Sequence, residues 1–137
     1  MIFLDTHVVS ETLKRTPEPT VLRWLETHDA ELALSTVVIA ELAFRISKIR
    51  PDERAQRLAD GLEAWRSRFA GRIFAFTEEA ALNYGELMGE AARAGRPMSA
   101  PDGMIAAIAR VHSAPLATRN VADFRETGVV LVDPWRG

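Results

Sequence analysis

The chain of 137 residues is long enough for one domain, because domains typically contain roughly 100–200 residues. Hydrophobic residues make up 47% of it and charged residues 26%, which excludes a disordered chain, a collagen and a coiled-coil rod. The net charge of −2 is not the strongly basic balance of a dedicated nucleic-acid binder, and the absence of cysteine excludes disulfide scaffolds, thiolate zinc sites and cysteine nucleophiles.

The first third of the chain alternates short apolar runs with helical patterns. The run of residues 2–4 predicts a strand that ends at Asp5, and residues 32–34 predict a second strand. Between them, residues 8–13 and 20–27 predict two helices, the first of which ends before Pro17.

The middle third repeats this alternation. Ser35 or Thr36 can cap a helix that runs to about residue 49, before Pro51. Asp52 caps the next predicted helix, residues 52–70, whose apolar residues recur on one helical face. Residues 73–76 predict a third strand.

The last third contains two more helices and two more strands. Thr77 caps a predicted helix over residues 78–94, which Gly95 ends, and residues 96–100 are expected to form a loop. Pro101 fits the first turn of a helix that runs to about residue 112. Residues 116–118 and 129–132 predict the fourth and fifth strands, and Asn120 is expected to cap a short turn between them.

Strands that alternate with helices predict an α/β fold. We expect a single domain, residues 1–137, with a parallel sheet of about five strands covered by helices on both faces. Continuously apolar strands fit burial on both faces. In such sheets, ligands bind at the carboxyl ends of the strands.

No part of the chain resembles a membrane segment, since the longest apolar runs contain only a few residues. The N-terminus lacks the basic and apolar regions of a signal peptide, so we expect a cytoplasmic protein.

Four acidic residues lie in unusually apolar surroundings: Asp5, Glu41, Asp102 and Asp123. Burial of an acid is costly unless it is paired or bound to a metal. Each also has a purely structural explanation: Asp5 can cap a helix, Asp102 can be a first-turn acid, and Glu41 can be a solvated helix residue. Three of the four, however, lie near strand ends that a parallel sheet brings to one edge.

A site made of carboxylates selects hard cations, so we expect Mg²⁺ or Mn²⁺ rather than zinc. Such ions promote phosphodiester cleavage, either singly or in pairs, and the four acids can supply one ion or two. Other phosphate chemistries lack their residues here: no glycine-rich loop follows Leu4, and His7 stands where a dehalogenase-like phosphatase needs a second acid.

These motifs resemble the PIN-domain family, and specifically the VapC/FitB-type toxins of bacterial toxin–antitoxin systems. The resemblance covers essentially the whole chain; its segments are residues 2–11, 34–42, 99–109, 116–124 and 128–135. The Thr-Arg-Asn-x-x-Asp-Phe run of residues 118–124 and the closing Asp133-Pro134-Trp135 look most like the FitB branch.

The resemblance implies a ribonuclease that depends on Mg²⁺ or Mn²⁺. The family's four acids correspond to the four acids above, and its hydroxyl and amide helpers correspond to Thr6, Thr118 and Asn120. His7 replaces the usual Asn, but some relatives carry His there. We expect His7 to be a helix-start residue that hydrogen-bonds Asp5 or nearby backbone; in a supporting role it would orient Asp5 or a metal-bound water.

The resemblance also implies partners. Such toxins pair with a small antitoxin whose tail covers the active site, and the pair binds operator DNA through the antitoxin. Family members usually form homodimers, for which the apolar faces of residues 52–70 or 78–94 can serve, although the same faces can belong to the core.

Two other functions stay open from the sequence. One is a PIN-fold module that binds RNA or protein without cleaving, and the other is cleavage of DNA rather than RNA. The presence of all four acids argues against the first, and only digestion of both polymers separates RNA from DNA cleavage.

Overall fold

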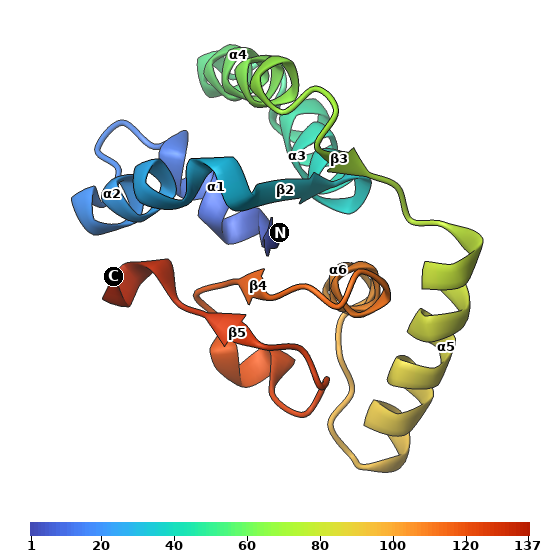
Figure 1. Cartoon of the computed structure of the whole chain (residues 1–137). Coiled ribbons are helices and arrows are strands. Elements are labelled where there is room, and N and C mark those ends of the chain that lie inside the picture. Colours follow the sequence, from blue (N-terminus) through green and yellow to red (C-terminus); the bar gives the residue numbers. More distant parts are fainter.

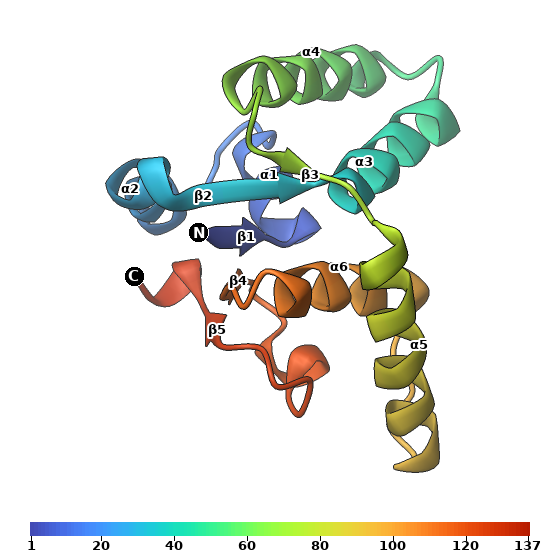
Figure 2. The same ribbon diagram turned by 45° about the vertical axis from the view of Figure 1, so that its right-hand side comes forward.

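Five short strands form one parallel sheet in the computed structural model, which describes all residues 1–137. They are β1 (Ile2–Leu4), β2 (Leu32–Ser35), β3 (Ile73–Phe74), β4 (Leu116–Ala117) and β5 (Leu131–Val132). The spatial order is β3-β2-β1-β4-β5, and every pairing is parallel. The predicted α/β fold is confirmed, and Figure 1 shows the strands interleaved with helices along the chain. Strand β1 lies at the centre of the sheet, between β2 and β4 (Figure 2).

Six helices and three short 3-10 turns connect the strands. The helices are α1 (Thr6–Thr12), α2 (Pro19–His28), α3 (Thr36–Ile49), α4 (Glu53–Arg68), α5 (Glu78–Arg93) and α6 (Ala100–Val111). The turns are η1 (Asp29–Glu31), η2 (Val121–Phe124) and η3 (Pro134–Arg136). None of the helices combines the length and the apolar composition needed to cross a membrane.

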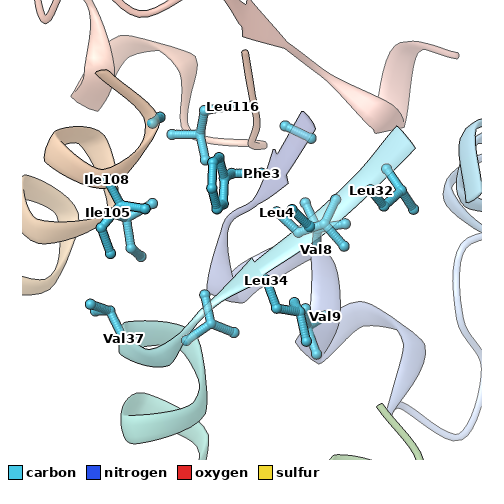
Figure 3. Packing of buried hydrophobic residues seen from close by; sticks show 14 of the residues in the cluster. Phe3, Leu4, Val8, Val9, Leu32, Leu34, Val37, Ile105, Ile108 and Leu116 are labelled. Carbon is cyan, nitrogen blue, oxygen red and sulfur yellow. The ribbon is translucent and has the colours of Figure 1, made fainter. Parts of the chain in front are cut away.

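The sheet is buried on both faces. Phe3 and Leu4 are neighbours in β1 and therefore point to opposite faces, yet each is at most 1% exposed. Figure 3 shows both within the apolar cluster that Ile105 and Ile108 of α6 join from one side and Val8 and Val9 of α1 from another. The ring of Phe3 also meets Phe74 of β3 edge to face, with centroids 5.6 Å apart.

The apolar faces of α4 and α5 are largely used inside the molecule, where Ala55 and Leu58 of α4 form a small separate cluster with Ile46 of α3. Trp65 of α4 packs against the main cluster, and Leu87 of α5 is part of it. Leu82 of α5 stays exposed. Gly103 of α6 allows α5 to approach closely, because a Cβ there would lie 2.4 Å from the sulfur of Met88.

Several predicted boundaries shift. The helix predicted from residue 8 begins at Thr6, because the Asp5 side chain accepts a hydrogen bond from the Thr6 N–H. The helix predicted after the loop of residues 96–100 begins at Ala100, where Ser99 caps it. The strands predicted over 73–76 and 129–132 keep only two residues each, which are the residues that pair with β2 and β4.

One predicted cap is wrong. Turn η2 does begin after Asn120, but the Asn120 side chain makes no capping hydrogen bond. Its amide lies 3.1 Å from Nδ1 of His7 instead. The turns η1 and η3 were not predicted, since three-residue turns leave no periodic pattern in the sequence.

Candidate functional site

The four predicted acids come from four separate elements. Asp5 directly follows β1, Glu41 lies in the second turn of α3, which directly follows β2, and Asp123 lies in η2 after β4. Asp102 lies in the first turn of α6. Figure 2 shows the arrowheads of β1 and β2 pointing toward the side of the molecule at which α3 begins.

Asp5 is the most firmly held of the four. Its carboxylate is only 2% exposed and accepts two hydrogen bonds at 2.8 Å, from the hydroxyl of Thr118 and from the N–H of Thr6. The Thr118 hydroxyl in turn accepts the N–H of Asn120 at 3.0 Å. Asp5 therefore caps α1, which is one of the two roles that the sequence allowed. Its carboxylate also belongs to the candidate acidic site, which we define as Asp5, Glu41, Asp102 and Asp123.

Glu41 is not a freely solvated helix residue. It is half-buried and accepts a hydrogen bond from the Thr6 hydroxyl at 2.5 Å. Thr6 and Glu41 are 35 positions apart, so this contact joins α1 to α3 at the start of both helices. Thr6 thus contacts both Asp5, through its backbone, and Glu41, through its side chain.

The pKa of Asp102 shows that the acids influence one another. Burial raises this pKa above its ordinary value, and the negative charge of Asp5 raises it further, with smaller contributions from Asp123 and Glu41. A hydrogen bond with Ser99 opposes the increase. Coulomb repulsion weakens with distance, so Asp102 lies close enough to each of the other three acids for its pKa to respond to their charges.

The donor set in this region suits a hard cation. All four side chains offer carboxylate oxygens, with hydroxyls of Thr6 and Thr118 behind them. No three His, Asp or Glu side chains are already arranged around a common metal position. Mg²⁺ does not require such a cage, because it keeps several waters and binds through one or two carboxylates.

His7 lies beside the acids without bonding to them. Its Nδ1 is 3.7 Å from a carboxylate oxygen of Asp5, too far for a hydrogen bond, and its side chain is 63% exposed. The expected hydrogen bond to Asp5 or to nearby backbone is therefore wrong. The partner is the Asn120 side chain, which connects the start of α1 to the loop after β4.

Two polar residues with defined contacts were missed from the sequence. Ser99 caps α6 and contacts Asp102, which Ser-x-x-Asp spacing would have indicated. Glu11 is a fifth acid, 5% exposed. It pairs with Lys14 at 2.9 Å and accepts the N–H of Glu18 at 3.0 Å. These contacts describe a structural acid that closes the loop between α1 and α2.

Replacing Glu11 by Gln is expected to lower the free energy of unfolding by about 1–3 kcal/mol, because a buried charged partner is lost. Burial raises the pKa of Glu11, but Lys14 and the Glu18 N–H outweigh it, so the net pKa lies below its ordinary value of 4.5. The stabilisation is therefore present above pH 4.5 and is lost as the pH falls through the lowered pKa. Urea unfolding at neutral and acid pH measures the loss in the free energy of unfolding at each pH. Glu63→Gln, at an exposed position of α4, is the control. Equal losses for both variants would contradict it.

Comparisons with known proteins relate the whole chain to one family. The PIN domain family model matches residues 2–130. A VapC ribonuclease of Sinorhizobium fredii, Y4jK, is 35% identical over 137 residues, which cover 98% of each chain. Toxin FitB of Neisseria gonorrhoeae is 36% identical and covers 98% of this chain and 99% of its own.

Solved structures of toxin–antitoxin proteins contain chains with the same fold. FitAcB from Neisseria gonorrhoeae superposes with a TM-score of 0.89 at 35% identity and covers all of both chains. VapBC2 from Rickettsia felis, bound to a DNA fragment from its promoter, superposes with a TM-score of 0.82 at 28% identity, over 97% of this chain and 98% of that chain.

Proposed function

This chain belongs to the PIN-domain family, in the group of the VapC and FitB toxins, and on that premise we propose that it hydrolyses RNA phosphodiester bonds with a divalent metal ion. The observation that carries the proposal is the contact of Thr6 with both Asp5 and Glu41. The charges of Asp5, Asp123 and Glu41 also raise the pKa of Asp102, after burial, which is the larger cause. Mutual repulsion of four acids at one edge is unfavourable for the fold, so a bound cation is the simplest reason to bring them together.

Asp5 and Asp102 are the proposed ligands of Mg²⁺ or Mn²⁺, and Glu41 and Asp123 add negative charge around the same position. When bound, the ion would neutralise charge on the phosphate and make an attacking water more acidic. Both tasks favour phosphodiester hydrolysis at neutral pH. Carboxylates without thiolates or clustered imidazoles suit these ions better than zinc.

The residues around the acids orient them. Thr118 and the Thr6 N–H hold the carboxylate of Asp5 in one direction, and the Thr6 hydroxyl holds Glu41. Ser99 fixes the start of α6, so Asp102 is directed by a capped helix. His7 and Asn120 form an exposed polar pair next to Asp5, where they can contact a phosphate or a water at the site.

Replacing Thr118 by Val is expected to reduce RNA cleavage and metal affinity by about 10- to 100-fold, as is typical when a group that orients a metal ligand is lost. Val keeps the shape but removes the hydroxyl that donates to Asp5 and accepts from Asn120. Initial cleavage rates against metal concentration measure the effect.

Thr12→Val is the matched control, because the Thr12 hydroxyl also donates one hydrogen bond, to the Val9 carbonyl, and accepts one, from Trp65. It should lose stability while its metal dependence stays unchanged. If both variants showed the same metal dependence as the unmodified protein, Thr118 would have no positioning role.

The proposed partner is a small antitoxin with a DNA-binding part. The neighbouring structures of VapBC2 and FitAcB support pairing, and the first of them contains promoter DNA. The net charge of −2 is consistent with DNA contacts made by the antitoxin rather than by this chain. Co-purification with the product of an adjacent small reading frame tests this pairing.

The activity itself is tested by digestion. Purified protein with Mg²⁺ or Mn²⁺ is expected to cleave structured RNA, such as transfer or ribosomal RNA, and to leave single- and double-stranded DNA intact. Binding of RNA without cleavage at any metal concentration would favour a non-cleaving module. Cleavage of DNA at the same rate would make the protein a general nuclease.

A further inference from the structure

A small basic pocket lies between α1, α3 and α4, outside the acidic site. It has a volume of about 140 Å³, several times the roughly 30 Å³ of a water molecule in the liquid. The charged side chains in its wall are all positive: Lys14, Arg45, Arg54 and Arg57. The remaining wall is Ser10 and three apolar side chains, and no acid lines the pocket.

Two of these four cations have acidic partners outside the pocket, and two do not. Lys14 pairs with Glu11 and Arg54 with Asp52. Arg45 has only a hydrogen bond to the Ser10 hydroxyl, at 3.3 Å. The Nε–H of Arg57 is buried and has no hydrogen-bond partner at all. Arg45 and Arg57 therefore place two positive charges without an acidic partner in the wall of this pocket.

The pocket and the acidic site lie along the same pair of helices, α1 and α3. The contact between Thr6 and Glu41 and the contact between Ser10 and Arg45 both join α1 to α3. Each residue of the second contact lies four positions after its counterpart in the first, which is about one helical turn, or 5.4 Å, along each helix. The Ser10–Arg45 wall of the basic pocket therefore lies about one helical turn from the Thr6–Glu41 contact of the acidic site.

We propose that this pocket binds a backbone phosphate of the RNA strand, a nucleotide or more from the bond that is cut; the proposal rests on the ribonuclease function above. Guanidinium groups donate several hydrogen bonds in a plane and match phosphate oxygens. The apolar side chains Leu13, Ile49 and Leu58 lower the local dielectric and strengthen the attraction. Binding there would also offset the repulsion between the acidic site and the strand.

The test is RNA binding by protein that carries Asp102→Asn, so that the strand stays intact. Arg57→Gln and Arg45→Gln are each compared with Arg66→Gln, which removes the same charge from a residue of α4 paired with Glu63. Affinity for a fluorescent single-stranded RNA is measured over a range of salt concentrations. Each pocket variant should bind several-fold more weakly, with a salt slope smaller by about 0.7, the value for one lost phosphate contact on a single strand. Arg66→Gln should keep the slope.

Arg45 is exposed, so Arg45→Gln keeps the test valid if Arg57→Gln unfolds. Unchanged affinity and slope in Arg45→Gln and in folded Arg57→Gln would overturn the proposal, even if the unmodified protein cleaves RNA. If the pocket variants showed a smaller salt slope of RNA affinity while the unmodified protein cleaved no RNA, the phosphate site would be upheld and the ribonuclease function rejected. Unchanged RNA binding together with loss of the co-purified antitoxin would assign the pocket to acidic groups of that partner and also overturn the proposal.

Discussion

Replacing Asp102 by Asn is expected to slow RNA cleavage by about 100- to 1,000-fold, by analogy with the loss of one group that stabilises transition-state charge. Asn keeps the shape and one acceptor oxygen but removes a negative charge from the proposed metal ligands. Cleavage rates under saturating Mg²⁺ measure the effect. Asp60→Asn on α4, which removes an exposed acid, is the control. An Asp102→Asn protein that cleaves at the unmodified rate would contradict the mechanism.

The Asp102→Asn protein should fold normally, so a loss of cleavage would come from the changed site and not from unfolding. Burial and the neighbouring acids raise the pKa of Asp102, so its contribution to stability is fully present below its ordinary value of 3.8 and is lost as the pH rises through the raised pKa. Asn carries no charge at any pH. In metal-free protein at neutral pH, Asp102→Asn should therefore melt at the same or a higher temperature than the unmodified chain.

Removal of divalent metal is expected to abolish cleavage completely, since the acids alone cannot neutralise a phosphate. A chelator should stop the reaction, and added Mg²⁺ or Mn²⁺ should restore it. Metal that binds only the native state also stabilises it, by about 2.7 kcal/mol at 100 times the dissociation constant. Thermal melting should show this gain in the unmodified protein and a smaller one in Asp102→Asn. Full activity in excess chelator would rule out a metal-dependent reaction.

The central part of the fold could be predicted because its sequence signals are local. Runs such as residues 2–4 and 32–34 are continuously apolar, and the structure buries them on both faces of the sheet. The caps Ser35, Asp52 and Thr77 act where the sequence indicated. The edge strands were predicted too long, because apolar residues at a sheet edge need not be hydrogen-bonded to a neighbour.

The acids could be predicted as a group, but not the contacts that hold them. The hydroxyl that fixes Asp5 belongs to Thr118, 113 positions away, and a resemblance to a family rather than a pattern in the sequence named that residue. The pairing of His7 with Asn120 depends on how α1 meets the loop after β4. Arg45 and Arg57 look like ordinary solvated helix residues until α1, α3 and α4 are packed together.

Metal binding tests the central claim most directly. A calorimetric titration of the purified protein with Mn²⁺ should show saturable binding at one or two sites, which Asp5→Asn and Asp102→Asn each greatly weaken and Asp60→Asn leaves unchanged. This result would place the ion among the acids at the carboxyl edge of the sheet. Binding of equal strength in all four proteins, or no binding in the unmodified one, would contradict the account.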